Sequence, residues 1–170
     1  NNLFGLHEEL SAGKYFPNKY QFFYVRDPKL RPIHKAKVKD RVVFQAVFRI
    51  LYHIFDRLFI FDSFSCRFAK STHAGVKRLA EFVKKESKNY SRNVFILKCD
   101  VKQFFYSIDH KIISDLVKAQ IKDEQVLALI EKINRSFCTS PDKGLPLGNV
   151  TSQLLANVYL NELDQFVKHV

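Results

Sequence analysis

Two short extended segments near the start of the chain are separated by a turn signal. Phe22–Val25 is rich in aromatic and β-branched residues, and Arg31–His34 resumes an extended pattern after Pro28. Proline has a fixed φ that suits a turn, and it cannot continue a helix. The pattern therefore predicts a hairpin over residues 22–34 with its turn at Pro28.

Apolar residues then recur every three or four positions, which is typical of helices with one buried face. From Asp40 onward this spacing predicts a long helix with apolar residues at Val43, Ala46, Val47, Ile50, Leu51, Ile54, Phe55 and Leu58. After a cap at Ser71 or Thr72, a second helix carries Val76, Leu79, Ala80 and Val83. A third is predicted around Val126, Leu129, Ile130 and Ile133. After a cap at Asn149 or Thr151, a last helix carries Leu154, Leu155, Val158, Tyr159 and Leu163.

One short apolar run has the composition of a strand. Val94–Leu97 is bounded by polar residues and predicts a buried strand that presents Asp100 at its end. Ser140–Gly148 holds two prolines and two glycines in nine residues, so it is predicted to be a loop. The chain as a whole is predicted to mix α and β structure.

Composition adds a core and a strong positive charge to this pattern. The 170 residues are 46% hydrophobic, which is enough for a sizeable core. Lysine and arginine number 28 against 17 acidic residues, so the net charge is +11. Such an excess is typical of surfaces that bind phosphate, and a merely basic protein is the alternative.

The cysteines and the lengths of the apolar runs indicate the cellular compartment of the protein. Cys66, Cys99 and Cys138 form no CxxC pair, which argues against a disulfide framework or a zinc site. No apolar run approaches the roughly 18 residues of a membrane span, and the start lacks a secretory signal. The expected location is the cytoplasm, and the absence of methionine predicts a fragment of a longer protein.

Asp100 is the first candidate for chemistry. An aspartate held at a strand end can bind Mg²⁺, which prefers hard oxygen ligands, although an aspartate there is more often a turn former or a helix cap. The string from Leu97 to His110, LKCDVKQFFYSIDH, resembles motif A of reverse transcriptases. The resemblance implies that Asp100 is a catalytic metal ligand, with the carbonyl of Val101 as a further ligand. It also implies that Phe105 blocks the ribose 2′-hydroxyl.

A glycine-containing loop that opens a helix is the second candidate. Residues 144–164, GLPLGNVTSQLLANVYLNELD, resemble motif B of the same family. The resemblance implies that Leu147 and Gly148 lie beside the nucleotide, because glycine lets the backbone approach closely. The pentapeptide GLPLG alone is a weak signal, and its union with the helix that follows makes the match specific.

Cations cluster in two further stretches. Residues 29–43 resemble the fingers motifs of group II intron and related enzymes, which implies that the incoming triphosphate is bound by Lys35, Arg41 and Arg31. Residues 64–73 resemble a segment that supports the template strand, which implies phosphate contacts from Arg67 and Lys70. For each cation taken alone, a solvated surface charge is the alternative.

The resemblance implies an α+β fold, the fingers and partial palm of a right-hand polymerase. It places fingers at 1–92, the motif A palm strand at 93–112, fingers and palm helices at 113–143, and the motif B loop and palm helix at 144–170. The implied activity is RNA-directed DNA polymerase, with two Mg²⁺ ions, an RNA template, a DNA primer, deoxynucleotides and an accessory RNA-binding protein. The family's Asp-Asp motif is missing from the sequence. The rest of the palm and the thumb are therefore expected outside this chain, which alone is expected to be inactive.

Motif B also bears on the class of enzyme. Group II intron enzymes usually have Gln-Gly-x-x-x-Ser-Pro where this chain has LGNVTSQ, from Leu147 to Gln153. The departure resembles the enzymes of diversity-generating retroelements, which copy RNA with frequent errors at adenines. The group II intron and retron classes stay open. So do two other kinds of function: a non-catalytic RNA-binding module on a polymerase-like scaffold, and a basic face that docks an acidic protein.

Overall fold

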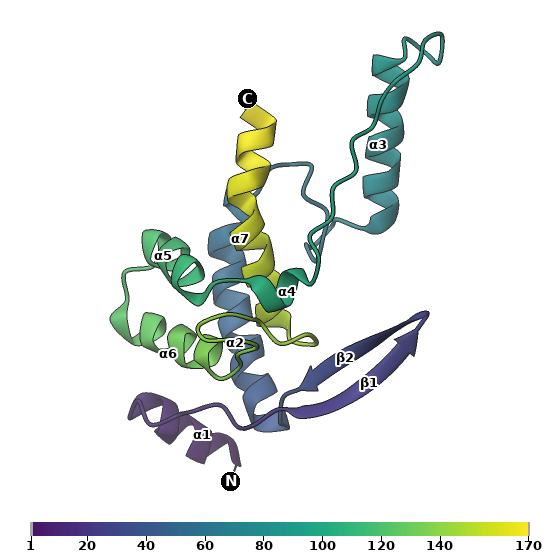
Figure 1. The fold of residues 1–170 in the computed structure, drawn as a ribbon. Coiled ribbons are helices and arrows are strands. Elements are labelled where there is room, and N and C mark those ends of the chain that lie inside the picture. Colours follow the sequence, from purple (N-terminus) through teal and green to yellow (C-terminus); the bar gives the residue numbers. More distant parts are fainter. Residues whose placement is uncertain (1, 170) are drawn as a thin grey trace.

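The computed structural model describes residues 2–169. Asn1, in the range predicted as fingers, and Val170, in the range predicted as palm helix, lie outside the described residues. In chain order the elements are α1 (Asn2–Ser11), β1 (Gln21–Asp27), β2 (Lys29–Lys35), α2 (Val38–Phe55), a 3-10 turn (Asp56–Leu58), α3 (Thr72–Glu86), α4 (Phe104–Ser107), α5 (His110–Gln120), α6 (Glu124–Arg135) and α7 (Val150–His169). Figure 1 shows α2 and α7 side by side at the centre, α5 and α6 on one side, and the hairpin and α3 projecting outward. Among the helices described, none has the length and apolar character to cross a membrane.

The hairpin predicted around Pro28 is confirmed. β1 pairs antiparallel with β2 from Gln21 opposite Lys35 to Asp27 opposite Lys29, which leaves Pro28 in the turn. Every residue of β1 is exposed, so the hairpin is an arm that stands away from the body. Only its base is tied to the rest of the chain, where Ala36 is buried just after β2.

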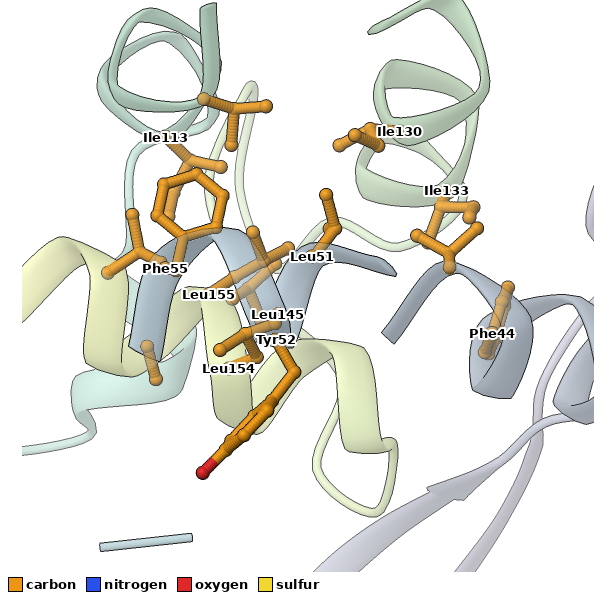
Figure 2. Packing of buried hydrophobic residues seen from close by; sticks show 14 of the residues in the cluster. Phe44, Leu51, Tyr52, Phe55, Ile113, Ile130, Ile133, Leu145, Leu154 and Leu155 are labelled. Atoms are coloured by element: carbon orange, nitrogen blue, oxygen red, sulfur yellow. The ribbon is translucent and has the colours of Figure 1, made fainter. Parts of the chain in front are cut away.

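The core forms between α2 and α7, which were each predicted as a helix with a buried face. Val43, Val47, Leu51 and Phe55 lie at four-residue steps on α2 and are all buried. They share the core with residues of α5, α6 and α7 that Figure 2 shows close by, among them Ile113, Ile130, Leu154 and Leu155. Each fully buried aliphatic or aromatic side chain of this kind contributes about 1.5–3 kcal/mol to folding. The packed core therefore sets the position of α7 and of the loop that precedes it.

The starts of three helices have side-chain caps. The hydroxyl of Ser71, and not that of Thr72, accepts from the amide of Ala74 at 3.1 Å and caps α3. Asp109 and Asp123 do the same for α5 and α6. Such caps satisfy amides that lack a partner inside the helix. Asp109, within the motif A string, thus has a structural role.

The predicted strand at Val94–Leu97 is wrong. The residues between α3 and α4 have no strand, and Phe95 and Leu97 are 96% and 89% exposed. A strand needs the backbone of a neighbour to pair with, and within residues 2–169 the hairpin is the only sheet. The apolar run therefore lies open beside α3 and does not enter the core (Figure 1).

A buried aspartate joins the start of α2 to the segment before β1. The carboxylate of Asp40 is fully buried and accepts from the Tyr15 hydroxyl at 2.8 Å. It also accepts from the backbone amide of Asn18 at 3.1 Å and from the side-chain amide of Asn18 at 3.2 Å. Burial, and then the neighbouring Asp40, raise the pKa of Tyr15, so the phenol stays protonated as a donor. The sequence pattern marked Asp40 only as a helix start.

Candidate active site and nucleic-acid interface

The motif B loop is fastened to the motif A segment by hydrogen bonds. The amide of Leu145 donates to the carbonyl of Phe105 at 2.7 Å, and the amide of Gly144 donates to the carbonyl of Ile108 at 2.8 Å. On the same loop, Nε2 of buried His110 lies 2.7 Å from the carbonyl oxygen of Gly144. A carbonyl only accepts, so this nitrogen carries the hydrogen. The two predicted motifs are therefore held together as one unit.

The other side of the loop rests on the hairpin. The amide of His34 in β2 donates to the carbonyl of Leu147 at 2.9 Å. Gly148 has φ of +110°, and a Cβ added there would lie 3.2 Å from Cγ2 of Ile33. Glycine is needed here for both its φ and its lack of a side chain. Segments around residues 34, 105 and 147, far apart in sequence, thus converge at one place.

An aromatic cluster fills the junction around His34. Its ring centroid lies 4.5 Å from that of Phe137, 5.3 Å from that of Phe22 and 6.3 Å from that of Tyr106. Burial lowers the pKa of His34, so the ring is neutral at pH 7. Nδ1 is buried with no partner among the described residues. The sequence pattern did not predict this cluster, because its members come from three separate segments.

Three cations surround one depression at the base of the hairpin. Lys35, Lys37 and Arg41 line it together with Gln21, Ala36 and Val38, and all three are exposed. The depression lies at the start of α2, where the helix dipole favours an anion. Lys35 and Arg41 are thus brought together as predicted, and Lys37 joins them. The four-residue step from Lys37 to Arg41 at a helix start was the signal that could have identified it.

Arg31 lies apart from this group. It is exposed in β2 opposite Val25, four residues before Lys35 and toward the tip of the hairpin. Within residues 2–169 it forms no ion pair. Its guanidinium is free to meet a ligand that lies along the arm, but not one confined to the depression.

Asp100 lies on the open segment between α3 and α4. Its side chain is exposed and has no hydrogen bond or ion pair in the described part of the chain, and Val101 is 51% exposed. Among residues 2–169, no group of three or more His, Cys, Asp or Glu side chains could hold a metal ion. Asp100 is therefore an exposed carboxylate that belongs to no such group of three among residues 2–169.

The sequence that contains these segments matches a known protein family. The family model for reverse transcriptase (RNA-dependent DNA polymerase) matches residues 24–170. The chain belongs to this family. The predicted resemblance to reverse transcriptases is thereby confirmed.

Relatives of this reverse transcriptase chain include proteins of introns. The group II intron-encoded protein LtrA of Lactococcus lactis subsp. cremoris is 30% identical over 169 residues, which are 94% of this chain and 27% of that protein. The protein YkfC of Escherichia coli is 26% identical over 170 residues, 95% of this chain and 44% of that protein. An uncharacterized 91 kDa protein in the cob intron of Schizosaccharomyces pombe is 27% identical over 82% of this chain and 17% of that protein. The chain thus spans less than half the length of these relatives.

Arg67 of this reverse transcriptase chain is engaged within its own loop. Its side chain is 8% exposed, and Nε donates to Asp56 at 2.7 Å. Nη1 donates to the carbonyls of Ile60 and Ser63 at 2.8 and 3.1 Å, and Nη2 to that of Asp56 at 3.1 Å. The hydrogen bond from Arg67 lowers the pKa of Asp56. This geometry favours a structural role in the loop over the predicted phosphate contact.

Lys70 is also engaged nearby. Its ammonium donates to the carbonyl of Phe61 at 2.7 Å and lies over the rings of Phe61 and Phe64, 3.4 and 4.9 Å from their centroids. A cation over an aromatic face is held electrostatically. A phosphate at Lys70 would compete with these contacts, so the geometry gives the predicted role little support.

Gly148→Ala in the full-length protein should weaken deoxynucleotide binding. Alanine must adopt a φ of +110° and place its Cβ 3.2 Å from Ile33, so the loop or the hairpin has to shift. Backbone strain of this kind costs about 1–3 kcal/mol, so the KM for the nucleotide should rise about 5-fold or more. The matched control is Gly13→Ala, because Gly13 also has a positive φ but no atom within 4 Å of an added Cβ. An unchanged KM for Gly148→Ala would contradict the assignment of the loop.

Proposed function

We propose that the full-length protein is an RNA-directed DNA polymerase. The observation that supports the proposal is that hydrogen bonds join the motif A segment, the motif B loop and β2. Leu145 of the loop is bonded to Phe105 of the motif A segment, and Leu147 of the loop is bonded to His34 of β2. In the proposed reaction the 3′-hydroxyl of a DNA primer attacks the α-phosphate of a deoxynucleotide. A bond forms between that oxygen and phosphorus, the bond to the β-phosphate oxygen breaks, and pyrophosphate leaves.

The charges near the junction support roles in binding the nucleotide. Lys35, Lys37 and Arg41 surround one depression and would neutralise the triphosphate. Arg31 would contact the triphosphate only if this ligand extended along the hairpin. Asp100 and the carbonyl of Val101 would supply ligands to one of two magnesium ions, which stabilise the charge of the transferring phosphate when bound. The remaining carboxylates would come from sequence outside this chain.

The fingers and palm of a right-hand polymerase can also be assigned to ranges of this chain. Residues 1–92 would be fingers, 93–112 and 144–170 would belong to the palm, and 113–143 would be helices between fingers and palm. The run Val94–Leu97 would pair with a palm strand from outside this chain, because Phe95 and Leu97 are exposed and no strand within residues 2–169 pairs with it. A thumb would likewise come from outside.

Phe105 is proposed to select the sugar. Its ring is half-buried beside Phe104, with centroids 5.9 Å apart, and its carbonyl accepts from the amide of Leu145. The backbone of Phe105 is thus held next to the loop that would bind the nucleotide. A ring beneath the sugar there would leave no room for a 2′-hydroxyl.

Phe105→Ala should therefore relax the choice between deoxynucleotides and ribonucleotides. Removing a steric block of this size changes discrimination by about 1–3 kcal/mol, or about 5- to 150-fold. The measurement is primer extension on an RNA template with each nucleotide class, comparing wild type with Phe105→Ala and with Phe104→Ala as control. A wild-type protein that extends no primer contradicts the proposed function. Unchanged discrimination in an active Phe105→Ala protein contradicts only the role of Phe105.

The retroelement class is proposed to be the diversity-generating type. The support is Leu147, an apolar residue where group II intron enzymes usually have glutamine; its carbonyl accepts from His34. An apolar side chain makes no hydrogen bond to the nucleotide, which favours misincorporation. Sequencing of DNA copies made by the full-length protein should show errors concentrated at template adenines. Evenly distributed rare errors would favour the group II intron or retron classes. The proposed partners are the template RNA, a DNA primer and an accessory RNA-binding protein.

A further inference from the structure

The face of α2 that points away from the core carries a line of polar side chains at four-residue steps. Arg41, Gln45, Arg49 and His53 lie on α2, Arg57 follows in the 3-10 turn, and all five are exposed. Residues four apart are neighbours on a helix, with a rise of about 6 Å per step. This set of five, the α2 basic line, extends over about 24 Å.

The charge of the α2 basic line is not neutralised by the protein. No acidic residue occurs between Asp40 and Asp56 in the sequence. Asp40 is fully buried, and Asp56 accepts a hydrogen bond from Arg67. In the part of the chain that the structure describes, none of the three arginines of the line forms an ion pair. A row of arginines without ion pairs attracts a polyanion.

The opposite face of α2 forms the core with α7. Val43, Val47, Leu51 and Phe55 are buried there, so the α2 basic line lies on the far side of the helix from the core. Its first residue, Arg41, also lines the depression at the base of the hairpin. The line therefore starts at the candidate nucleotide site and leads away from it along α2.

We propose that the α2 basic line beyond Arg41, from Gln45 to Arg57, binds the phosphodiester backbone of an RNA outside the candidate active site. Its rise per step is comparable to the separation of successive phosphates along a ribonucleotide strand. Arginine is suited to this ligand, because its planar guanidinium donates two parallel hydrogen bonds to a phosphate. Gln45 and His53 add further hydrogen-bond donors between the arginines. Binding would be insensitive to base sequence, since every contact is to the backbone.

The test measures RNA binding by the full-length protein without nucleotides. Labelled single-stranded polyuridine is titrated at several salt concentrations with wild type and with Arg49→Gln/Arg57→Gln. Each lost phosphate contact should reduce the slope of log affinity against log salt by about 0.7, so the pair should reduce it by about 1.4. Arg49→Lys/Arg57→Lys should retain most of the slope. Both side chains are exposed, so the melting temperature should not change.

The matched control is Lys84→Gln/Lys85→Gln, which removes the same charge from the exposed end of α3. It should leave the slope near that of wild type. The rate of primer extension at saturating primer–template should be unchanged in the arginine pair, because neither arginine lies at the candidate active site. A wild-type slope in Arg49→Gln/Arg57→Gln would overturn the proposal and leave this face, with Val42 and Ile50 exposed on it, to a protein partner. An equal fall in the lysine control would also overturn it, since only net charge would then matter.

Discussion

Asp100→Asn in the full-length protein is expected to reduce primer extension by about 10³-fold or more. Asparagine keeps the shape of the side chain but removes the charge that a magnesium ion requires, and the metal stabilises the transition state by several kcal/mol. Each 1.36 kcal/mol corresponds to about a tenfold change in rate. The measurement is single-turnover extension of a DNA primer on an RNA template.

The fold should tolerate Asp100→Asn. Asp100 is exposed and makes no hydrogen bond within the described residues, so the free energy of unfolding should change by less than about 0.5 kcal/mol. Asp115→Asn is the matched control, because Asp115 is an exposed aspartate on α5. It should extend primers like wild type. Activity of Asp100→Asn within a few-fold of wild type would show that Asp100 is not a metal ligand, and unfolding of this variant would show a structural role.

Asp40→Ala is expected to lower the free energy of unfolding more than any other substitution proposed for this chain. The substitution removes a fully buried carboxylate that accepts three hydrogen bonds from Tyr15 and Asn18. Each buried donor left without a partner costs about 1–3 kcal/mol, so a total of about 3 kcal/mol or more is expected. The loss should be local to the start of α2 and the segment before β1.

Hydrogen exchange of the full-length protein measures this loss directly. Amides in residues 12–20 and in the first turns of α2 should exchange about 100-fold faster in Asp40→Ala than in wild type, as a loss of about 3 kcal/mol requires. Asp40→Asn should show a smaller effect, since the amide retains one oxygen acceptor. Asp123→Ala is a useful comparison, because it removes an exposed helix cap, which is worth about 1 kcal/mol. Equal protection in Asp40→Ala and wild type would contradict the structural role of Asp40.

The elements that spacing alone predicted are those with local determinants. α2 was predicted because Val43, Val47, Leu51 and Phe55 repeat at helical steps, and the hairpin because Pro28 separates two extended runs. The strand at Val94–Leu97 was predicted by the same reasoning and does not form. Its composition suits a strand, but pairing depends on a second strand that residues 2–169 do not contain.

The candidate site was also predicted only in part from the sequence. The motifs around Asp100 and Gly148 were found through their resemblance to a family, and their union through the carbonyl of Phe105 is visible only in the structure. Asp40 and His34 were missed as structural residues because their partners are distant in sequence.

Arg67 shows the limit of predicting a role from charge and resemblance. The sequence marks it as a cation in a stretch similar to a template-supporting segment. The surrounding carbonyls and Asp56, which engage the guanidinium, are positioned only by the folded loop. Burial and hydrogen-bond partners are tertiary properties, and they decide whether an arginine is available to a phosphate.

The RNA-directed DNA synthesis proposed for the full-length protein would take place at the junction of Asp100, Phe105 and the motif B loop. It is tested most directly by incubating the full-length protein with a defined RNA template, an annealed DNA primer, deoxynucleotides and Mg²⁺, and sequencing the product. The expected product is DNA complementary to the template, and it should be lost on chelation of the metal and in Asp100→Asn. RNA binding without extension by the intact wild-type protein would contradict the account and favour a non-catalytic RNA-binding module.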